Sequence, residues 1–151
     1  MANKFRKVLT LSLSEWAELI ISAEALFEAR IIFANQPAKT LLARLKKPVS
    51  GFPEESGARD QAVDDQLVRL EWALSVAARI LPWRTDCLIR CIAADKILRR
   101  RNLEPHFYLG VTQQTDTGFG AHAWIRCRGI SVAGGEGKEF EVLIGPEELK
   151  R

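Results

Sequence analysis

The sequence predicts an α+β fold, in which helices come first and one further helix leads into a small antiparallel sheet. Three observations support this prediction. Apolar residues recur at helical spacing in much of residues 1–81, which are rich in Ala, Leu and Ile. A new helical segment begins at Cys87, and short strand-like segments with glycine-containing turns follow it. We expect a helical region at residues 1–47, a linker at 48–60 and a core at 61–151, together forming one compact domain.

Three helices are predicted in the first half of the chain. The first follows Ser12 and Glu15, whose spacing fits a capping box, and its apolar residues keep helical spacing to about residue 33. The second is predicted at residues 37–45, because proline is tolerated where a helix opens. The third covers residues 61–81 and carries an apolar stripe along one face. We interpret these helices as a packing layer.

The second half of the chain changes from helical to strand-like periodicity. A fourth helix is predicted at residues 87–101, with Asn102 as its stop. Arg128 and Gly129 are turn residues between two strand-like segments. The predicted strands are His106–Thr112, Ala121–Cys127, Ile130–Ala133 and Glu139–Ile144.

Composition and charge narrow the function classes. Hydrophobic residues make up 47% and charged residues 27%, which is typical of a folded domain rather than of a disordered chain. A net charge of +3 is too mild to indicate nucleic-acid binding, and Arg99–Arg101 are better explained as cations at a helix C-terminus. The most apolar segment, residues 19–34, contains three charged residues, so no membrane insertion is expected. The odd cysteine count and the lack of a signal-peptide pattern favour free thiols in the cytoplasm.

Cys87 is the best candidate for a nucleophile. It follows the capping-type residues Thr85 and Asp86 at the predicted start of a helix, where free N–H groups and the positive end of the helix dipole stabilise a thiolate. Cys91 and Cys127 are expected to be buried and inert. Three residues separate the first two cysteines, which does not fit a redox pair, and no ligand spacing suggests a metal site.

His122 is the candidate base, because the chain presents a cysteine at a helix start and then a histidine on the second of two strands. Thiol enzymes present their dyad in this order, and the histidine takes the thiol proton before protonating the leaving amine. Trp124 lies on the same strand face and either packs the sheet or lines a substrate groove. Trp83 and Arg84 are candidates for the oxyanion side of the pocket, whose main donor would be the backbone N–H of Cys87.

Four motifs resemble the transglutaminase-like leader peptidases of lasso-peptide biosynthesis, and the similarity covers about residues 60–144. The motifs are PWRTDCLIR at residues 82–90, RRRNL at 99–103, LGV at 109–111 and GFGAHAW at 118–124.

The resemblance implies a papain/transglutaminase-like core that removes the leader from a ribosomally made precursor peptide. It also implies two partners, a small leader-recognition protein and an asparagine-synthetase-like macrolactam cyclase. At 151 residues the chain resembles the stand-alone form, which lacks a leader-recognition domain. Some relatives use ATP, but the sequence has no glycine-rich phosphate loop, and we expect no cofactor.

The third catalytic residue of that family is usually an Asp about a dozen residues beyond the histidine. If Arg128 and Gly129 form a two-residue hairpin turn, partner numbers sum to 257 and His122 faces Gly135, which is no acid. A bulge in the glycine-rich segment would bring Glu136 to the same face.

Further alternatives for the orienting group stay open. Glu139 and Glu141 are two of them. A dyad without an acid, or one oriented by a backbone carbonyl or amide, is another, because a thiolate–imidazolium pair depends less on an orienting acid than a serine enzyme does.

The sequence therefore predicts a cysteine endopeptidase that cleaves a leader peptide through a Cys87 thioester. One rival function is an acyl transferase that resolves the same thioester with an amine. The other is a catalytically degenerate scaffold that holds the precursor, an alternative kept open by Gly135.

Overall fold

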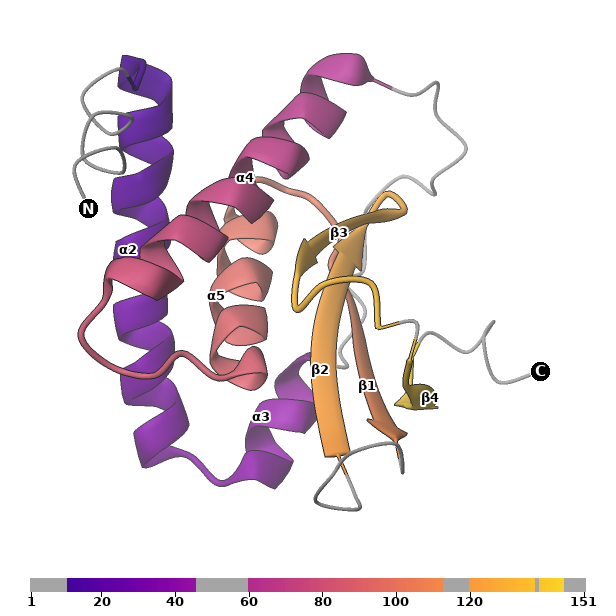
Figure 1. Ribbon diagram of the computed structural model, residues 1–151. Coiled ribbons are helices and arrows are strands. Elements are labelled where there is room, and N and C mark those ends of the chain that lie inside the picture. The colour runs from indigo at the N-terminus through magenta and orange to yellow at the C-terminus, as the bar shows by residue number, and fades with distance from the viewer. Residues whose placement is uncertain (1–10, 46–59, 113–119, 138, 146–151) are drawn as a thin grey trace.

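The structure is a computed structural model that describes residues 11–45, 60–112, 120–137 and 139–145 (Figure 1). It confirms the predicted α+β class, with helices on one side and an antiparallel sheet on the other. The elements are α2 (Leu13–Asn35), α3 (Ala38–Leu45), α4 (Gln61–Ile80), α5 (Cys87–Arg100), β1 (His106–Thr112), β2 (Gly120–Cys127), β3 (Ile130–Ala133) and β4 (Glu141–Ile144).

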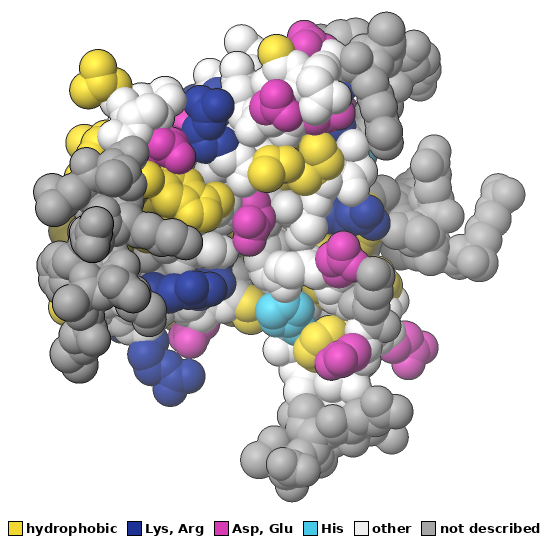
Figure 2. Space-filling view, turned by 45° about the horizontal axis from the view of Figure 1, so that its top comes forward, with side chains coloured by type: hydrophobic (Ala, Val, Ile, Leu, Met, Phe, Trp, Pro, Cys, Tyr) yellow, Lys and Arg dark blue, Asp and Glu magenta, His cyan; other side chains and the backbone are white. Residues whose placement is uncertain are grey.

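The distribution of surface charge and the hydropathy of the helices can be described for the part of the chain that the structure covers. On the face shown in Figure 2, acidic and basic side chains of the described residues are interspersed rather than gathered by sign. Within the described ranges, no helix is both long enough and apolar enough to cross a membrane. Among the described residues, this face therefore shows no patch of a single charge sign.

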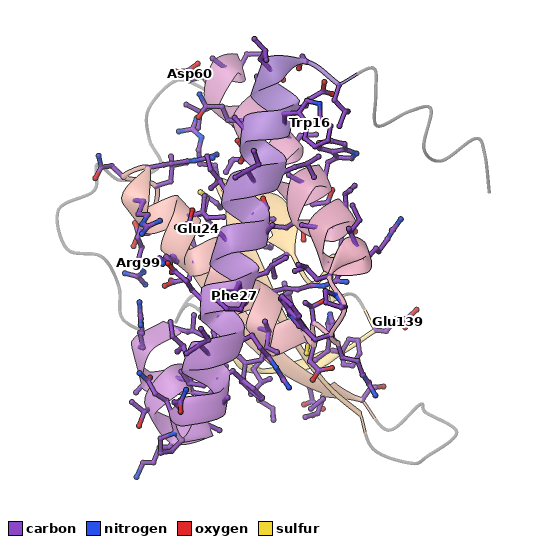
Figure 3. All side chains as sticks on the ribbon, turned by 90° about the vertical axis from the view of Figure 1, so that its left-hand side faces the viewer. Trp16, Glu24, Phe27, Asp60, Arg99 and Glu139 are labelled. Atoms are coloured by element: carbon purple, nitrogen blue, oxygen red, sulfur yellow. The ribbon has the colours of Figure 1, made fainter. Side chains whose placement is uncertain are left out.

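Helix α2 begins with the predicted capping box. The backbone N–H of Glu15 donates to Ser12 Oγ, and the N–H of Ser12 donates to the Glu15 carboxylate at 2.7 Å. These hydrogen bonds lower the pKa of Glu15. One face of the helix buries small and branched residues such as Leu26 against α4 and α5, while Phe27 remains about half exposed (Figure 3). Since α2 contributes to the central hydrophobic cluster, it supports the helix that carries Cys87.

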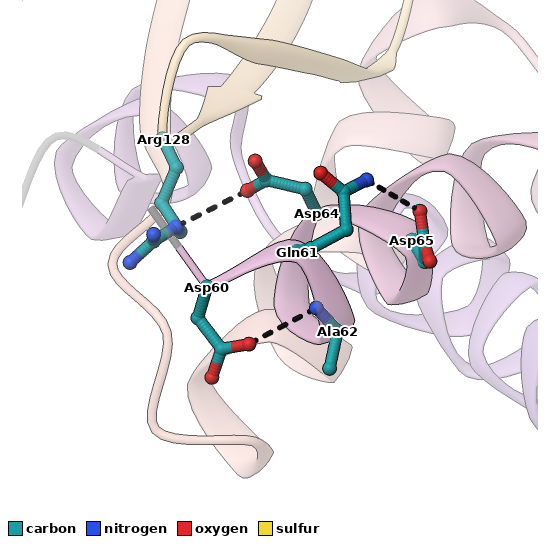
Figure 4. A network of polar contacts seen from close by, with 6 residues as sticks. All are labelled: Asp60, Gln61, Ala62, Asp64, Asp65 and Arg128. Carbon is teal, nitrogen blue, oxygen red and sulfur yellow. Dashed lines mark hydrogen bonds and ion pairs between the residues drawn. The ribbon is translucent and has the colours of Figure 1, made fainter. Parts of the chain in front are cut away.

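Helix α4 connects the helical layer to the sheet at its N-terminal end (Figure 4). Asp60 caps the helix by accepting a hydrogen bond from the Ala62 N–H at 3.0 Å. Asp64, in the first turn, forms an ion pair at 3.4 Å with Arg128 at the β2–β3 turn. The start of α4 is therefore attached to the hairpin whose first strand carries His122.

Helix α5 is the central helix and is packed against both layers. Its residues include the fully buried Ile89, and it contacts α2, α4, β2 and β3. Asn102 ends the helix with a positive φ of 55°, and the Leu103 N–H donates to the Leu98 carbonyl at 2.9 Å, as in a Schellman motif. The predicted stop at Asn102 is therefore confirmed. Two ion pairs attach α5 and its C-cap to α2: Lys96 with Glu28, and Arg101 with Glu18.

The sheet has the strand order β3-β2-β1-β4, and all of its pairs are antiparallel. The predicted hairpin turn is confirmed, since Cys127 pairs with Ile130 and both Arg128 and Gly129 have positive φ. Strand β4 begins at Glu141 rather than at residue 139 and pairs with β1, so the last strand in sequence lies at the edge away from β3.

The predicted register beyond the hairpin is wrong. Arg126 pairs with Ser131, as a sum of 257 requires, but Ile125 pairs with Ala133, so the partner numbers then sum to 258. A β-bulge at Val132 inserts one extra residue into β3 and causes the shift. Consequently Gly135 is not the residue that this register places opposite His122.

Candidate active site

An open pocket of about 480 Å³ lies between the start of α5 and the open end of the β2–β3 hairpin, which is the end away from its turn. One wall comes from α5 and the residues before it, and the other comes from β2 and the segment after β3. The residues that line it are Thr85, Asp86, Cys87, Arg90, His122 and Gly134. The two side chains that the sequence nominated as nucleophile and base, Cys87 and His122, thus line one pocket.

Cys87 is the first residue of α5, as the sequence predicts. Asp86 precedes it in an extended conformation (φ −67°, ψ 162°) and is the N-cap, but its side chain makes no capping hydrogen bond. The Asp86 carboxylate instead approaches Arg84 at 3.7 Å. Ser12 and Asp60, by contrast, cap α2 and α4 with their side chains. The first N–H groups of α5 therefore receive no hydrogen bond from the N-cap side chain, next to residues that line the pocket.

The other two cysteines are buried, as the sequence predicts, and none of the three forms a disulfide. Burial raises the pKa of Cys91 well above its ordinary value, and the nearby Cys87 and Asp95 raise it further. Cys91 is therefore a protonated thiol within the core at neutral pH. Cys87 is the only one of the three that lines the pocket.

His122 lies on β2 opposite Gly110 of β1. Its Nε2 is 2.5 Å from the backbone carbonyl oxygen of Gly134. A carbonyl can only accept, so Nε2 carries the hydrogen of the neutral ring and Nδ1 is left as the basic nitrogen. The ring also stacks on Phe140, with centroids 5.0 Å apart, and lies 6.1 Å from the Trp124 ring. These contacts fix the orientation of the imidazole.

Two glycines make this arrangement possible. Gly134 has a φ of +82°, and a Cβ there would lie 2.3 Å from the Ala123 carbonyl oxygen, so only glycine fits this close to β2. A Cβ at Gly110 would lie 2.8 Å from the Phe140 Cβ and would push that ring away from His122. The segment after β3 is further held by Ser131, whose Oγ donates to the Gly135 carbonyl at 2.5 Å.

The carboxylates considered as a third catalytic residue all lie at exposed positions. They are Glu136, Glu139 and Glu141. His122 Nε2 forms its hydrogen bond with the Gly134 carbonyl instead. A backbone carbonyl, which was one of the alternatives from sequence, therefore occupies the orienting position, while the assignment of Glu136 stays a prediction.

The three predicted substrate-binding residues do not line the described pocket. Trp83 packs against Phe27 of α2, with ring centroids 5.8 Å apart. The Arg84 side chain is 94% exposed. Trp124 is buried and stacks on Tyr108 at 5.4 Å, nearly parallel, so it packs the sheet behind His122.

Sequence reasoning missed two residues of the site. Arg90 lines the pocket one turn after Cys87, and its spacing of three within a predicted helix was a usable signal. Phe140 had no such signal, because its contact with His122 depends on β4 pairing with β1. Within the described residues, no cluster of three or more His, Cys, Asp or Glu side chains could hold a metal ion.

Comparison with known families agrees with the fold and with the composition of this pocket. The family model for the transglutaminase-like superfamily matches residues 28–145, and the chain belongs to this superfamily. Its members are typically cysteine peptidases or acyltransferases. Searches of curated proteins and of solved structures gave no match.

Proposed function

We propose that the chain is a cysteine peptidase that removes the leader from a ribosomally made lasso-peptide precursor. The observation that carries the proposal is the shared pocket, in which Cys87 at a helix start faces the same cavity as His122 on β2. The motifs around both residues resemble lasso-peptide leader peptidases. Membership of the transglutaminase-like superfamily supports the cysteine-based chemistry.

His122 Nδ1 first takes the proton of the Cys87 thiol, which gives the thiolate–imidazolium pair that reacts with the substrate. The thiolate attacks the scissile carbonyl carbon, and the resulting oxyanion is stabilised by the uncapped N–H groups at the start of α5. The tetrahedral intermediate collapses to a thioester, while the leaving amine takes the proton from His122. Water, deprotonated by the same imidazole, then hydrolyses the thioester and regenerates the thiol.

In this proposal the Gly134 carbonyl does the work of the family's aspartate. It accepts the Nε2–H of His122, which leaves Nδ1 as the nitrogen that can act on the Cys87 thiol. A neutral carbonyl stabilises an imidazolium less than a carboxylate does, but a cysteine enzyme that starts from a thiolate–imidazolium pair needs less of that stabilisation. The site therefore does not require an acid in the third position.

The substrate and partners of this proposal come from the motif resemblance. A leader-recognition protein would deliver the precursor, and an asparagine-synthetase-like cyclase would close the macrolactam ring in the cytoplasm. Residues 1–47 are proposed to dock the leader-recognition protein. Deleting them would also remove Leu26 from the core, so exposed positions of α2 such as Ile20 and Ile31 are better sites for testing partner binding.

Precursor cleavage in the presence of the leader-recognition protein tests the proposal, with the products followed by mass spectrometry. Wild type should release the leader, whereas Cys87→Ala and Cys87→Ser should lower the rate by about a thousandfold or more while still binding the precursor. Cys91→Ala is the matched control, since it removes a thiol of the same helix outside the pocket. Equal cleavage by wild type and Cys87→Ala would refute the proposal.

The acyl-transferase alternative shares the thioester and differs only in what resolves it. The same cleavage reaction should therefore be run with a labelled primary amine. Label on the released leader would indicate transfer, whereas an unlabelled leader with a free carboxylate would indicate hydrolysis. Precursor binding without either product would support the scaffold alternative.

A further inference from the structure

Arg90 occupies an unusual position beside the candidate nucleophile. It lies three residues after Cys87 on α5, so the two side chains share one face of the helix, and both line the pocket. Side chains on a helix lean toward its N-terminus. The guanidinium of Arg90 therefore extends along the turn that carries Cys87.

One donor of the Arg90 guanidinium lacks an acceptor. Its Nε is shielded from solvent and has no hydrogen-bond partner. Two acids near α5 contact other arginines. Asp86, the N-cap, lies 3.7 Å from Arg84, and Asp95 pairs with Arg99 at 2.7 Å. A shielded N–H donor without an acceptor costs free energy, and an oxygen brought by a ligand removes that cost.

The chemistry of the pocket identifies the ligand group. A guanidinium has donors only, and its planar fork matches the two oxygens of a carboxylate. The other basic group in the pocket, His122, already donates its Nε2–H to the Gly134 carbonyl. Asp86 lies at the exposed side of the pocket, with its side chain 52% accessible, so solvent weakens its repulsion of an incoming anion.

We propose that Arg90 is a substrate-binding residue that holds a carboxylate next to the bond attacked by Cys87. This inference deepens the proposed function and takes from it only the reactivity of Cys87. The carboxylate has two possible sources, an acidic side chain beside the scissile bond or a free α-carboxylate. Both would place their oxygens on the same guanidinium.

A pair of thiol reagents tests the proposal without the precursor. Iodoacetate carries a carboxylate and iodoacetamide carries a neutral amide, while both alkylate the thiolate. Because any effect on the thiolate itself changes both rates together, the ratio of the iodoacetate rate to the iodoacetamide rate reports recruitment of the carboxylate. The two rates at Cys87 would be measured on the full chain at pH 7 by peptide mass spectrometry.

The variants separate charge, shape and position. Arg90→Gln should lower the ratio by roughly fivefold or more, and Arg90→Lys should keep part of it because it keeps the charge. Arg100→Gln is the matched control, since it removes an exposed cation of the same helix that does not line the pocket, and it should leave the ratio near the wild-type value.

An unchanged ratio in Arg90→Gln, or an equal fall in Arg100→Gln, would overturn the proposal for Arg90. Failure of Cys87 to react with either reagent would instead contradict the proposed nucleophile, so the two failures are distinguishable. Should Arg90→Gln fold poorly, the ratio in Arg90→Lys and its decrease with added salt give a second measurement. A salt-independent ratio would count against the proposal.

The source of the carboxylate is resolved with two further reagents. N-iodoacetyl-glutamate with an amidated α-carboxyl presents a side-chain carboxylate, and N-iodoacetyl-glycine presents an α-carboxylate. Each would be compared with its neutral amide counterpart in wild type and Arg90→Gln. The reagent whose advantage depends on Arg90 identifies the source, and the absence of any advantage for both would refute the carboxylate site.

Discussion

The two walls of the pocket are built in different ways. The wall that carries Cys87 is the start of a helix whose later turns are buried between α2, α4 and the sheet. The wall that carries His122 is a strand whose histidine is oriented by the carbonyl of Gly134 and by the ring of Phe140. Cys87 is thus positioned by the core of the whole molecule, whereas His122 is positioned by a few local contacts.

This difference implies that stability and catalysis depend on separate parts of the chain. Changes under the wall that carries Cys87, called the helix wall below, should lower the free energy of unfolding but leave the activity of the folded fraction unaltered. Changes beside His122 should lower turnover by more than they lower stability. The predictions below use this contrast.

The largest effect is expected under the helix wall, for Leu26→Ala. Leu26 is fully buried where α2 packs on α4 and α5, and its truncation should cost about 2–5 kcal/mol of unfolding free energy. Chemical denaturation measures the loss, and cleavage per folded molecule should stay near the wild-type value. Ile20→Ala is the control, since Ile20 is 64% exposed on the same helix and should cost less than about 0.5 kcal/mol. Comparable losses for both variants would contradict this account of the core.

Gly134→Ala tests the sheet wall, which consists of β2 with His122 and the segment after β3. The new Cβ would meet the Ala123 carbonyl, so the Gly134 carbonyl must move away from His122. We expect a loss of about 1–3 kcal/mol in stability and roughly a tenfold to hundredfold loss of cleavage rate per folded molecule.

Gly135→Ala is a closely matched control for Gly134→Ala. Gly135 also has a positive φ, +74°, but a Cβ there meets nothing within 4 Å. It carries the backbone strain of the substitution without the clash, so its stability should fall while its cleavage rate changes little. If both variants lost the same activity, the Gly134 carbonyl would not be the orienting group.

Phe140→Leu should have a smaller effect on the same wall. The substitution keeps an apolar side chain near Gly110 but removes the ring that stacks on His122 at 5.0 Å. We expect a cleavage rate lower by about fivefold, with a stability change below about 1.5 kcal/mol. Leu143→Ala in β4 is the control, because Leu143 is 55% exposed, and its rate should equal that of wild type.

The smallest effect concerns the pH dependence of the helix wall. Burial raises the pKa of Asp95 from the ordinary value of 3.8, and the hydrogen bond from Arg99 opposes this in part. The folded state therefore keeps the proton where the unfolded state has lost it. Asp95 contributes stability that is present below the ordinary pKa and is lost as pH rises through the raised one.

Asp95→Asn tests the sign of this dependence. Asparagine keeps an acceptor for Arg99 and does not titrate, so the wild-type free energy of unfolding should fall relative to that of the variant as pH increases above about 4. Urea denaturation at several pH values would measure the difference between the two proteins. A difference that grows in favour of wild type would show that the carboxylate, rather than the protonated acid, is stabilised in the fold.

Local sequence signals predicted the helix wall well. The capping box of Ser12 and Glu15, the start of α5 at Cys87 and the stop at Asn102 depend on residues close in sequence, and all three were predicted. The hairpin turn at Arg128 and Gly129 was predicted for the same reason.

The sheet wall depends on contacts that sequence spacing does not encode. The bulge at Val132 shifts the register of β3 by one residue, and the partner of His122 Nε2 is the Gly134 carbonyl rather than a side chain. Phe140 reaches His122 only because β4 returns to pair with β1. A backbone carbonyl and a long-range strand pairing leave no residue-type signature in the sequence.

The most direct measurement of the central claim is the rate of iodoacetamide labelling of each cysteine in the native protein at pH 7. We predict rapid labelling of Cys87, no labelling of Cys91 or Cys127, and a rate at Cys87 lower by about tenfold or more in His122→Gln. Peptide mass spectrometry after quenching assigns each label to its cysteine. Labelling of Cys87 at the same rate in wild type and His122→Gln would contradict the claim that the two residues act as a dyad.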